Sequence, residues 1–283
     1  MGNTALVIDS TCDLPQAARD ELVSAMVPLH VQVGGVSYYD RVDLDPQGFY
    51  KLFREAGQVA QSSQPSVGEF ASVYSDLLER YDAVVSVHIS GRLSGSVQSA
   101  TLAAETVDPS RILVIDSQKV SVGVGLVAQA AGEAIAAGED LAGIAAAAKA
   151  VAQQTRVFGT LQSLEVAVKG GRVNAHAARL ATLADLKPLI VFDDEGGAHT
   201  DGARIGFARA LRAVAERVAR FAPNGAVRAA IAHADGYEDA LYLRERLRGA
   251  LGDLDIPVLE AGAVITTHVG LGTVAIAVQR NAG

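Results

Sequence analysis

Short apolar runs alternate with segments of helical periodicity through the first half of the chain. The apolar runs lie at residues 5–9, 82–89 and 112–116. The helices that follow them are expected to begin at about Pro15, Ser94 and Ser121. Strand, loop and helix repeated in this order indicate a mostly parallel sheet with helices on both faces, an α/β fold. A fourth apolar run, residues 27–33, predicts a strand that ends in a turn at Gly34 and Gly35.

The pattern changes after the middle of the chain. Residues 128–151 are rich in alanine, and Gly138 and Gly143 interrupt them, so we expect two helices there. The chain has 283 residues, 49% of them hydrophobic and 20% charged. This length exceeds the usual limit of a single hydrophobic core, and the composition favours folded domains over disorder. Two domains are therefore the first expectation.

The second half resembles an α+β arrangement. Glu195-Gly196-Gly197 separates two β-rich segments, 186–193 and 198–205, in a pattern typical of a hairpin. The remaining predicted elements are helices at 207–221 and 237–251, a strand at 227–233 and two final strands. We place the domain boundary near residue 156, giving an α/β domain at 1–155 and a smaller α+β domain at 156–283.

Charge and cysteine content restrict the function. The formal net charge of −8, with a pI near 5.2, argues against nucleic-acid binding, which needs concentrated Lys and Arg. Cys12 is the only cysteine, so it cannot form an internal disulfide and is expected to be a buried free thiol. The N-terminus lacks a signal-peptide pattern, and apolar runs stop short of ~20 residues. We expect a soluble cytoplasmic protein.

Ligands of an open α/β sheet bind beyond the carboxyl ends of its strands, where hydroxyl-rich loops occur in this sequence. In the first such loop, residues 9–13, Asp13 is expected to cap the helix that begins at Leu14-Pro15. In the second, Ser66 and Glu69 fit a capping box. That assignment leaves Ser62 and Ser63 as potential donors to an anion, with ordinary loop polarity as the equal alternative.

Two further segments carry potential anion-binding groups. Residues 90–96 combine Gly91, Gly95 and Ser94 at a predicted helix start, which favours negative charge, although an N-cap role alone would explain Ser94. His268 lies between Thr267 and a Gly-x-Gly turn, where we expect a strand to end in a loop. A lone histidine is more often structural, but its polar surroundings favour a ligand contact.

Several enzyme classes lack their motifs here. The sequence has no phosphate-binding Gly-x-x-x-x-Gly-Lys-Ser/Thr loop and no Gly-x-Ser-x-Gly nucleophile elbow. The six histidines and Cys12 show no metal-ligand spacing, so no metal is expected. Arg172, in a positively charged turn, and Arg204, after the predicted hairpin, are ordinary surface charges or contacts for phosphate or a partner.

Taken together, these segments resemble the DegV family of fatty-acid-binding proteins over essentially the whole chain. The matching segments, in chain order, are Asp9-Ser10-Thr11, Asp13-Leu14, Ser63-Gln64-Pro65-Ser66, Ile89-Ser90, Leu93-Ser94-Gly95, Gln98-Ser99-Ala100, Asp116-Ser117, Leu164-Glu165, Lys169-Gly170-Gly171-Arg172, Lys187-Pro188 and Thr267-His268-Val269-Gly270. Each segment is weak evidence alone, but their shared order along one chain argues against chance.

The resemblance implies a non-catalytic carrier in which a long-chain fatty acid lies buried between the two domains. Its carboxylate would contact Ser62, Ser94 and His268, with Ser63 and Ser96 nearby. Arg172 and Arg204 would lie at the phosphate-facing and partner-facing edge.

The implied partner is a separate ATP-binding fatty acid kinase, which makes the acyl-phosphate used in phospholipid synthesis. No cofactor beyond the bound fatty acid is implied, and a transient membrane contact is compatible with this role. The sequence departs from the family pattern at Ser62, Gly91, Ser96 and Leu271, where Thr, Ser, Thr and Pro are common. The hydroxyl exchanges keep a donor, whereas the changes at Gly91 and Leu271 leave head-group and chain preference open.

The α/β half also looks similar to the substrate domain of dihydroxyacetone kinases, in which a histidine binds the substrate covalently. This similarity gives the alternative hypothesis of a phosphotransfer enzyme acting on a small hydroxy compound. The sequence contains no nucleotide-binding motif that would support an autonomous kinase.

Overall fold

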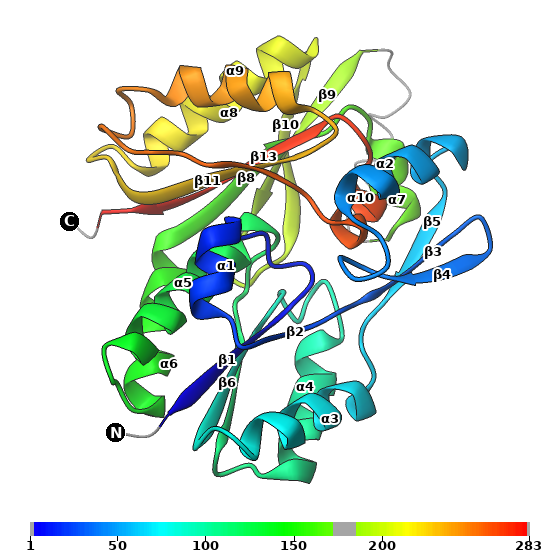
Figure 1. The fold of residues 1–283 in the computed structure, drawn as a ribbon. Helices are drawn as coiled ribbons and strands as arrows, with labels where there is room; N and C mark the ends of the chain where they lie inside the picture. Colours follow the sequence, from blue (N-terminus) through cyan, green and yellow to red (C-terminus); the bar gives the residue numbers. More distant parts are fainter. Residues whose placement is uncertain (1–2, 172–184, 282–283) are drawn as a thin grey trace.

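The computed structural model describes residues 3–171 and 185–281, and within them the strands form three sheets (Figure 1). The first is a parallel sheet in the order β2-β1-β6-β7. Its strands are β1 (Thr4–Asp9), β2 (Ala25–Val27), β6 (Ala83–His88) and β7 (Ile112–Asp116). All of its pairings are parallel, which confirms the predicted α/β class.

Helices cover both faces of this sheet, as the sequence predicted (Figure 1). The helices on one face are α3 (Val67–Leu78) and α4 (Ser96–Val107), and those on the other are α1 (Gln16–Leu22), α5 (Val122–Ala136) and α6 (Leu141–Gln154). Within β1, Ala5 and Val7 pack towards α3 and α4, whereas Leu6 and Ile8 pack towards α5. Burial on both faces explains why the strand is an uninterrupted apolar run.

The second sheet is small and antiparallel, with the order β4-β3-β5. Its strands are β3 (His30–Val33), β4 (Val36–Tyr39) and β5 (Ala60–Ser63), and α2 (Pro46–Glu55) lies between β4 and β5 in the chain. The predicted single strand at 27–33 was wrong, because it is divided between β2 and β3 in different sheets. Pro28, which has no backbone N–H to donate, lies at the break. The turn at Gly34 and Gly35 is confirmed by their positive φ angles of 59° and 81°.

The third sheet is mostly antiparallel, in the order β10-β9-β8-β13-β11-β12. Its strands are β8 (Thr155–Thr160), β9 (Leu186–Phe192), β10 (Ala198–Ile205), β11 (Ala226–Ala234), β12 (Val258–Glu260) and β13 (Thr273–Arg280). The helices α8 (Phe207–Phe221) and α9 (Tyr237–Leu247) cover its outer face. The β9–β10 hairpin is confirmed, while α9 ends at Leu247, before the predicted residue 251.

Side-chain size differs between the two faces of this sheet. Ile231 of β11 and Ile276 of β13 point outwards and pack with α8 and α9. Ala232 of β11 and Ala277 of β13 point inwards, towards the side where α5 lies. The alternation of small and large apolar residues along these strands therefore places the larger apolar side chains on the outer face.

Two short helices complete the described chain, α7 (Leu164–Lys169) and α10 (Ala263–Val269). Helix α10 packs against α2, β3, β5 and α7, so a late segment of the chain lies on an early sheet (Figure 1). The division of the chain near residue 156 stays a prediction. No helix within residues 3–171 and 185–281 is both long and apolar enough to cross a bilayer.

Candidate functional site

A mostly apolar cavity lies between the inner face of the six-stranded sheet and α10. Its other walls come from the loops after β6 and β7, including Leu93 and Val120. The space between atoms amounts to about 1090 Å³, with the open mouth included. A concave and mostly apolar space with a few polar groups in its wall is typical of small-molecule sites.

Small side chains on the sheet form the floor of this cavity. Gly159, Ala232, Ala234 and Ala275 line it from three adjacent strands, β8, β11 and β13. A Cβ atom at Gly159 would lie 3.1 Å from the Cβ atom of Ala275, so the backbones leave no room for more bulk there. The small side chains of the floor thus leave a space that larger strand residues would fill.

Ser62 and His268 form one polar contact in the wall. Ser62 is on β5 opposite Val31, and its hydroxyl lies 2.7 Å from Nε2 of His268. Both are half-buried and line the cavity, as does the neighbouring Ser63. The prediction that His268 ends a strand was wrong, because it lies in the last turn of α10. The helix projects its imidazole onto β5 although 206 positions separate the two residues.

Ser94 and Ser96 form a second polar contact. Their hydroxyl oxygens are 2.9 Å apart, and the backbone N–H of Ser96 donates to Ser94 Oγ at 3.3 Å. Ser94 lines the cavity, whereas Ser96 is fully buried behind it. Helix α4 begins at Ser96 with Gly95 as its N-cap, so Ser94 is not the N-cap. Its hydroxyl therefore lies at the cavity surface while it also contacts Ser96.

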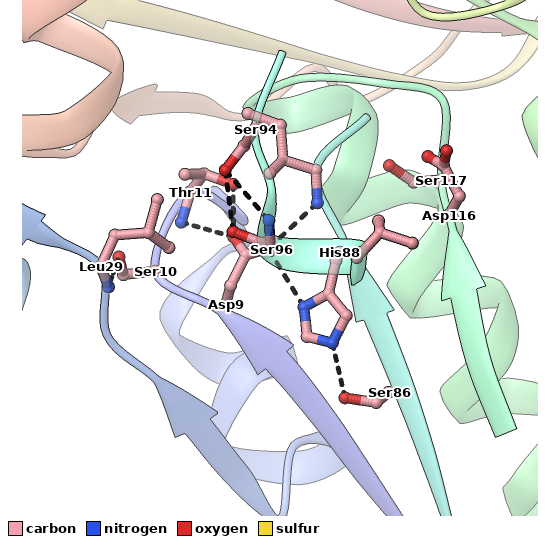
Figure 2. A network of polar contacts seen from close by, with 12 residues as sticks. Asp9, Ser10, Thr11, Leu29, Ser86, His88, Ser94, Ser96, Asp116 and Ser117 are labelled. Atoms are coloured by element: carbon pink, nitrogen blue, oxygen red, sulfur yellow. Dashed lines mark hydrogen bonds and ion pairs between the residues drawn. The ribbon is translucent and has the colours of Figure 1, made fainter. Parts of the chain in front are cut away.

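A fully buried polar network fixes the end of β6, from which the loop that carries Ser94 continues (Figure 2). Asp9, at the end of β1, accepts hydrogen bonds from the backbone N–H of Ile89 at 3.0 Å and from the hydroxyl and N–H of Thr11. Its other contact is with Nδ1 of His88 at 3.1 Å, and His88 Nε2 lies 2.7 Å from Ser86 Oγ. Because buried polar groups without partners are costly, this satisfied network strongly favours one loop conformation.

The first hydroxyl-rich loop contributes through such internal contacts. Asp9, Ser10 and Thr11 are 0% exposed and do not line the cavity. The expected helix cap at Asp13 was wrong, because Pro15 is the N-cap of α1 and Asp13 instead binds the guanidinium of Arg41 and the hydroxyl of Ser121. The capping box of Ser66 and Glu69 is confirmed on α3.

Four polar residues that the sequence did not single out also line the cavity, namely Gln64, Ser121, His233 and Thr273. Gln64 closely approaches Gly95, where an added Cβ would lie 2.9 Å from its amide nitrogen, so it joins the Ser62 and Ser94 segments. Burial lowers the pKa of His233, which favours its neutral form. Gln64 lies between Ser63 and Pro65 in the DegV-like segment, a position that could have drawn notice to it.

Of the two predicted arginine contacts, the structure describes only Arg204. Arg204 is exposed on β10, does not line the cavity and donates to the carbonyl of Ala203 at 2.8 Å. Arg172 lies outside the described residues. Cys12 is a buried free thiol as predicted, and burial together with the charges of Asp9 and Asp13 raises its pKa. Among the residues that the structure describes, no cluster of three His, Cys, Asp or Glu could hold a metal ion.

Comparison with known families gives a match along almost the whole chain. A family model described as an uncharacterised protein of the DegV family matches residues 3–281. A DegV domain-containing protein of Deinococcus radiodurans is 37% identical over 281 residues, covering 97% of this chain and 98% of that protein. Protein DegV of Bacillus subtilis is 30% identical over 279 residues, covering 97% and 98%.

Solved structures also match almost the whole chain. A DegV family protein from Thermus thermophilus, described by its fatty acid binding, superposes with a TM-score of 0.91 at 34% identity, covering 99% of this chain and 100% of that one. DegV of Bacillus subtilis, described as a fatty acid binding protein, gives a TM-score of 0.88 at 29% identity with the same coverage. The fold and the arrangement of its sheets are thus those of proteins with an experimentally determined structure.

Proposed function

Because this chain belongs to the DegV family, we propose that it binds a long-chain fatty acid in the apolar cavity and acts as a carrier without catalysing a reaction itself. The observation that carries the proposal is one cavity with an apolar floor and a polar wall that contains Ser62, Ser94 and His268. Several solved structures of the family are described as fatty-acid-binding proteins, which supports the same ligand class.

The polar wall suits a carboxylate. A buried carboxylate is costly unless hydrogen bonds satisfy it, and hydrogen bonds to charged groups are stronger than neutral ones. Ser62, Ser63 and Ser94 offer hydroxyl donors, and His268 offers a ring N–H or a positive charge. Ser96 acts from behind, since its own hydroxyl orients that of Ser94.

The apolar floor suits the acyl chain. Burial contributes about 0.8 kcal/mol per CH₂, so a long chain supplies most of the affinity while few polar groups set its direction. Small residues such as Ala232 and Ala275 leave the volume that the chain would fill. No ionisable side chain of the described residues other than His233 and His268 lines this cavity, so the chain would meet little desolvation penalty.

Mass spectrometry of the purified protein tests the ligand. Protein produced in a bacterial host is denatured, extracted with organic solvent and analysed, and stripped protein is then titrated with oleate and palmitate. We expect co-purified fatty acid and micromolar or tighter binding of at least one of the two. A protein that carries no lipid and takes up neither fatty acid contradicts the proposal.

Substitutions at the polar wall test the head-group assignment. Ser94→Ala and His268→Ala should each weaken fatty-acid binding by about 10- to 150-fold, because a hydrogen bond to a charged group contributes about 1.5–3 kcal/mol. His199→Ala, at an exposed histidine on the β9–β10 hairpin, is the matched control. Unchanged lipid occupancy in both cavity variants, with their fold intact by circular dichroism, would refute the assignment.

We further propose that the bound carboxylate is presented to a separate ATP-binding fatty acid kinase in the cytoplasm, for acyl-phosphate formation and phospholipid synthesis. Arg204 at the end of β10 and Arg209 and Arg212 on the first turns of α8 are exposed cations that could bind a phosphorylated partner. Arg172 is the second candidate from the sequence for this edge. Guanidinium groups bind phosphate oxygens in bidentate fashion.

The kinase role is tested with ATP and bound fatty acid, with and without a kinase subunit. We expect ADP and acyl-phosphate only when the kinase is present, and Arg204→Ala should lower that rate while fatty-acid binding is retained. Lys149→Ala, at a cation on α6, is the control for a change of charge alone. Turnover of a small hydroxy compound by this chain alone would favour the phosphotransfer hypothesis instead.

A further inference from the structure

Helix α10 places His268 in the cavity wall, yet it is only seven residues long. Isolated helices of this length are unstable in water, so tertiary contacts must hold α10 in place. Its own residues offer no side-chain N-cap, since Gly262 occupies that position. The contacts come instead from residues 40–50, which are more than 200 positions away in the sequence.

Asp40 satisfies the first backbone donors of α10. Its Oδ1 accepts a hydrogen bond from the N–H of Ala263 at 3.0 Å, and its Oδ2 accepts one from Val264 at 3.5 Å. These N–H groups have no partner within the helix, and a negative charge at this end is favourable. Asp40 is 1% exposed, so water cannot substitute for it.

Arg41 holds the segment just before α10. Its guanidinium donates to the carbonyls of Glu260 at 3.2 Å and Ser10 at 3.0 Å, and it pairs with Asp13. Gly262 packs so closely that an added Cβ would lie 3.1 Å from both Arg41 Nε and Asp40 Oδ2. Arg41 also has a φ of +63°, a conformation rarely adopted by residues other than glycine. Strained backbone of this kind persists only where the surrounding contacts enforce it.

Tyr50 adds a third contact from α2. Its hydroxyl lies 2.7 Å from the carbonyl of Ala261 and 3.1 Å from that of His233, so one donor bridges the strand β11 and the segment before α10. We call Asp40, Arg41 and Tyr50 the α10 clamp. Together they bind backbone groups of four of the five residues from 260 to 264.

We propose that Asp40 is a positioning residue for fatty-acid binding, since it fixes the start of α10 and thereby holds His268 against Ser62. The inference rests on the proposed function for its ligand, but its geometric part concerns this chain alone. Burial raises the pKa of Asp40 to about 6, so the ionised form that prevails at neutral pH holds the start of α10 at a cost to folding stability. A role in positioning is therefore separable from a role in folding.

Asp40→Asn tests the proposal, with Asp43→Asn as the matched control. The asparagine keeps the shape of Asp40 but replaces one acceptor with an NH₂ donor, so it cannot accept from both Ala263 and Val264. Asp43 is exposed in the same loop and accepts from the N–H of Tyr39 at 2.7 Å, away from α10. We expect Asp40→Asn to raise the Kd for oleate about tenfold with an unchanged or higher Tm, while Asp43→Asn leaves the Kd unchanged.

The imidazole of His268 gives an independent measurement. In stripped, ¹⁵N-histidine-labelled protein, the ring signals of His268, assigned by their loss in His268→Ala, should shift or broaden in Asp40→Asn and stay fixed in Asp43→Asn. Tyr50→Phe, which removes one hydroxyl only, should shift the same signals if the clamp acts as a unit. Unchanged His268 signals and an unchanged Kd in Asp40→Asn would overturn the proposal.

The two proposals fail in different ways. If the wild-type protein takes up no fatty acid, the proposed function is wrong, but the His268 signals still decide whether Asp40 positions that side chain. If the wild-type protein binds oleate and Asp40→Asn binds it equally well, the carrier function stands and the positioning role is wrong. A Tm that falls in parallel with affinity would show that Asp40 acts on global stability, which also overturns the positioning role.

Discussion

The polar wall and the apolar floor of the cavity are built in opposite ways. The polar wall has side chains from β5, α10 and the loop after β6, each fixed by hydrogen bonds to other parts of the molecule. The floor consists of small residues on β8, β11 and β13, whose positions are fixed by the sheet alone. The polar wall depends on hydrogen bonds, whereas the floor depends on the small size of its side chains.

This difference has a consequence for substitutions. A change in the polar wall removes a hydrogen bond, whose net contribution is modest, but it can also release a neighbour that the bond held in place. A change in the floor adds atoms to a space that the ligand needs, and the sheet cannot move to make room because it packs against α8 and α9. The floor should therefore determine chain length, and the polar wall should determine which end of the ligand binds where.

The largest expected effect concerns Asp40, which holds the start of α10 and so supports the polar wall. It is a pH dependence of the free energy of unfolding. The folded-state pKa of Asp40 is about 6, raised from 3.8 by burial and by the charge of Asp13, while Arg41 opposes the rise. Stability from this group is therefore present below pH 4 and is lost as the pH rises through 6, by about 3 kcal/mol for a shift of about two units. Urea unfolding between pH 4 and 7 should show that the free energies of unfolding of the wild type and Asp40→Asn differ most at pH 7 and converge towards pH 4. A constant difference across this range would contradict it.

The second largest effect is expected when a larger side chain fills the space above the floor and weakens fatty-acid binding. Ala275→Leu adds three carbon atoms to the cavity and should displace about three CH₂ groups of a long acyl chain, at about 0.8 kcal/mol each. The Kd for stearate should rise about 50-fold, and shorter fatty acids should lose less, as measured by titration calorimetry. Ala208→Leu, at an exposed position on α8, is the control. Equal losses for all chain lengths would show that Ala275 does not contact the chain.

Removing one hydroxyl from the polar wall should have a smaller effect. Ser62→Ala deletes the 2.7 Å contact with His268, and the net loss of about 1 kcal/mol predicts a Kd about fivefold higher for every chain length. The variant Ser62→Thr, which keeps the hydroxyl, should bind fatty acid with the wild-type affinity. A loss that depends strongly on chain length would mean that Ser62 contacts the acyl chain and not the head group.

A cap outside both regions should leave binding unchanged. Ser66→Ala removes the side-chain acceptor of the α3 capping box and should lower the free energy of unfolding by about 1 kcal/mol. The Kd for oleate should stay at the wild-type value, because Ser66 does not line the cavity. Denaturant unfolding and the same oleate titration measure the two quantities. An altered Kd would connect α3 to the site in a way that its position does not suggest.

Much of the local structure followed from the sequence pattern. The helix at 207–221 was predicted at both ends, because its apolar positions repeat with a helical period and glycine precedes it. The hairpin was predicted because Gly196 can adopt the positive φ of 82° that its turn requires. The run at 27–33 failed, since an apolar stretch does not tell which sheet each part joins.

The candidate site was predictable only in part. Ser62, Ser94 and His268 stood out because hydroxyls, glycines and a histidine gathered at expected element ends, and a family resemblance joined them. Ser121 and His233 were missed because nothing local distinguishes a cavity-lining polar residue from a surface one, whereas Gln64 was missed although it lies in a DegV-like segment. Asp40 carried no signal at all, because the groups that it holds on α10 are two distant backbone N–H groups.

The sequence by itself determined the α/β class, most helices and strands, and the polar character of the loops beyond β5 and β6. Such features depend on local periodicity and on backbone preferences that each segment carries alone. Only the tertiary structure decided that Ser62 meets His268, that Asp40 holds the start of α10, and that alanines on β11 and β13 leave a cavity. These depend on which distant surfaces pack together, and an empty space in particular is defined by all of its walls at once.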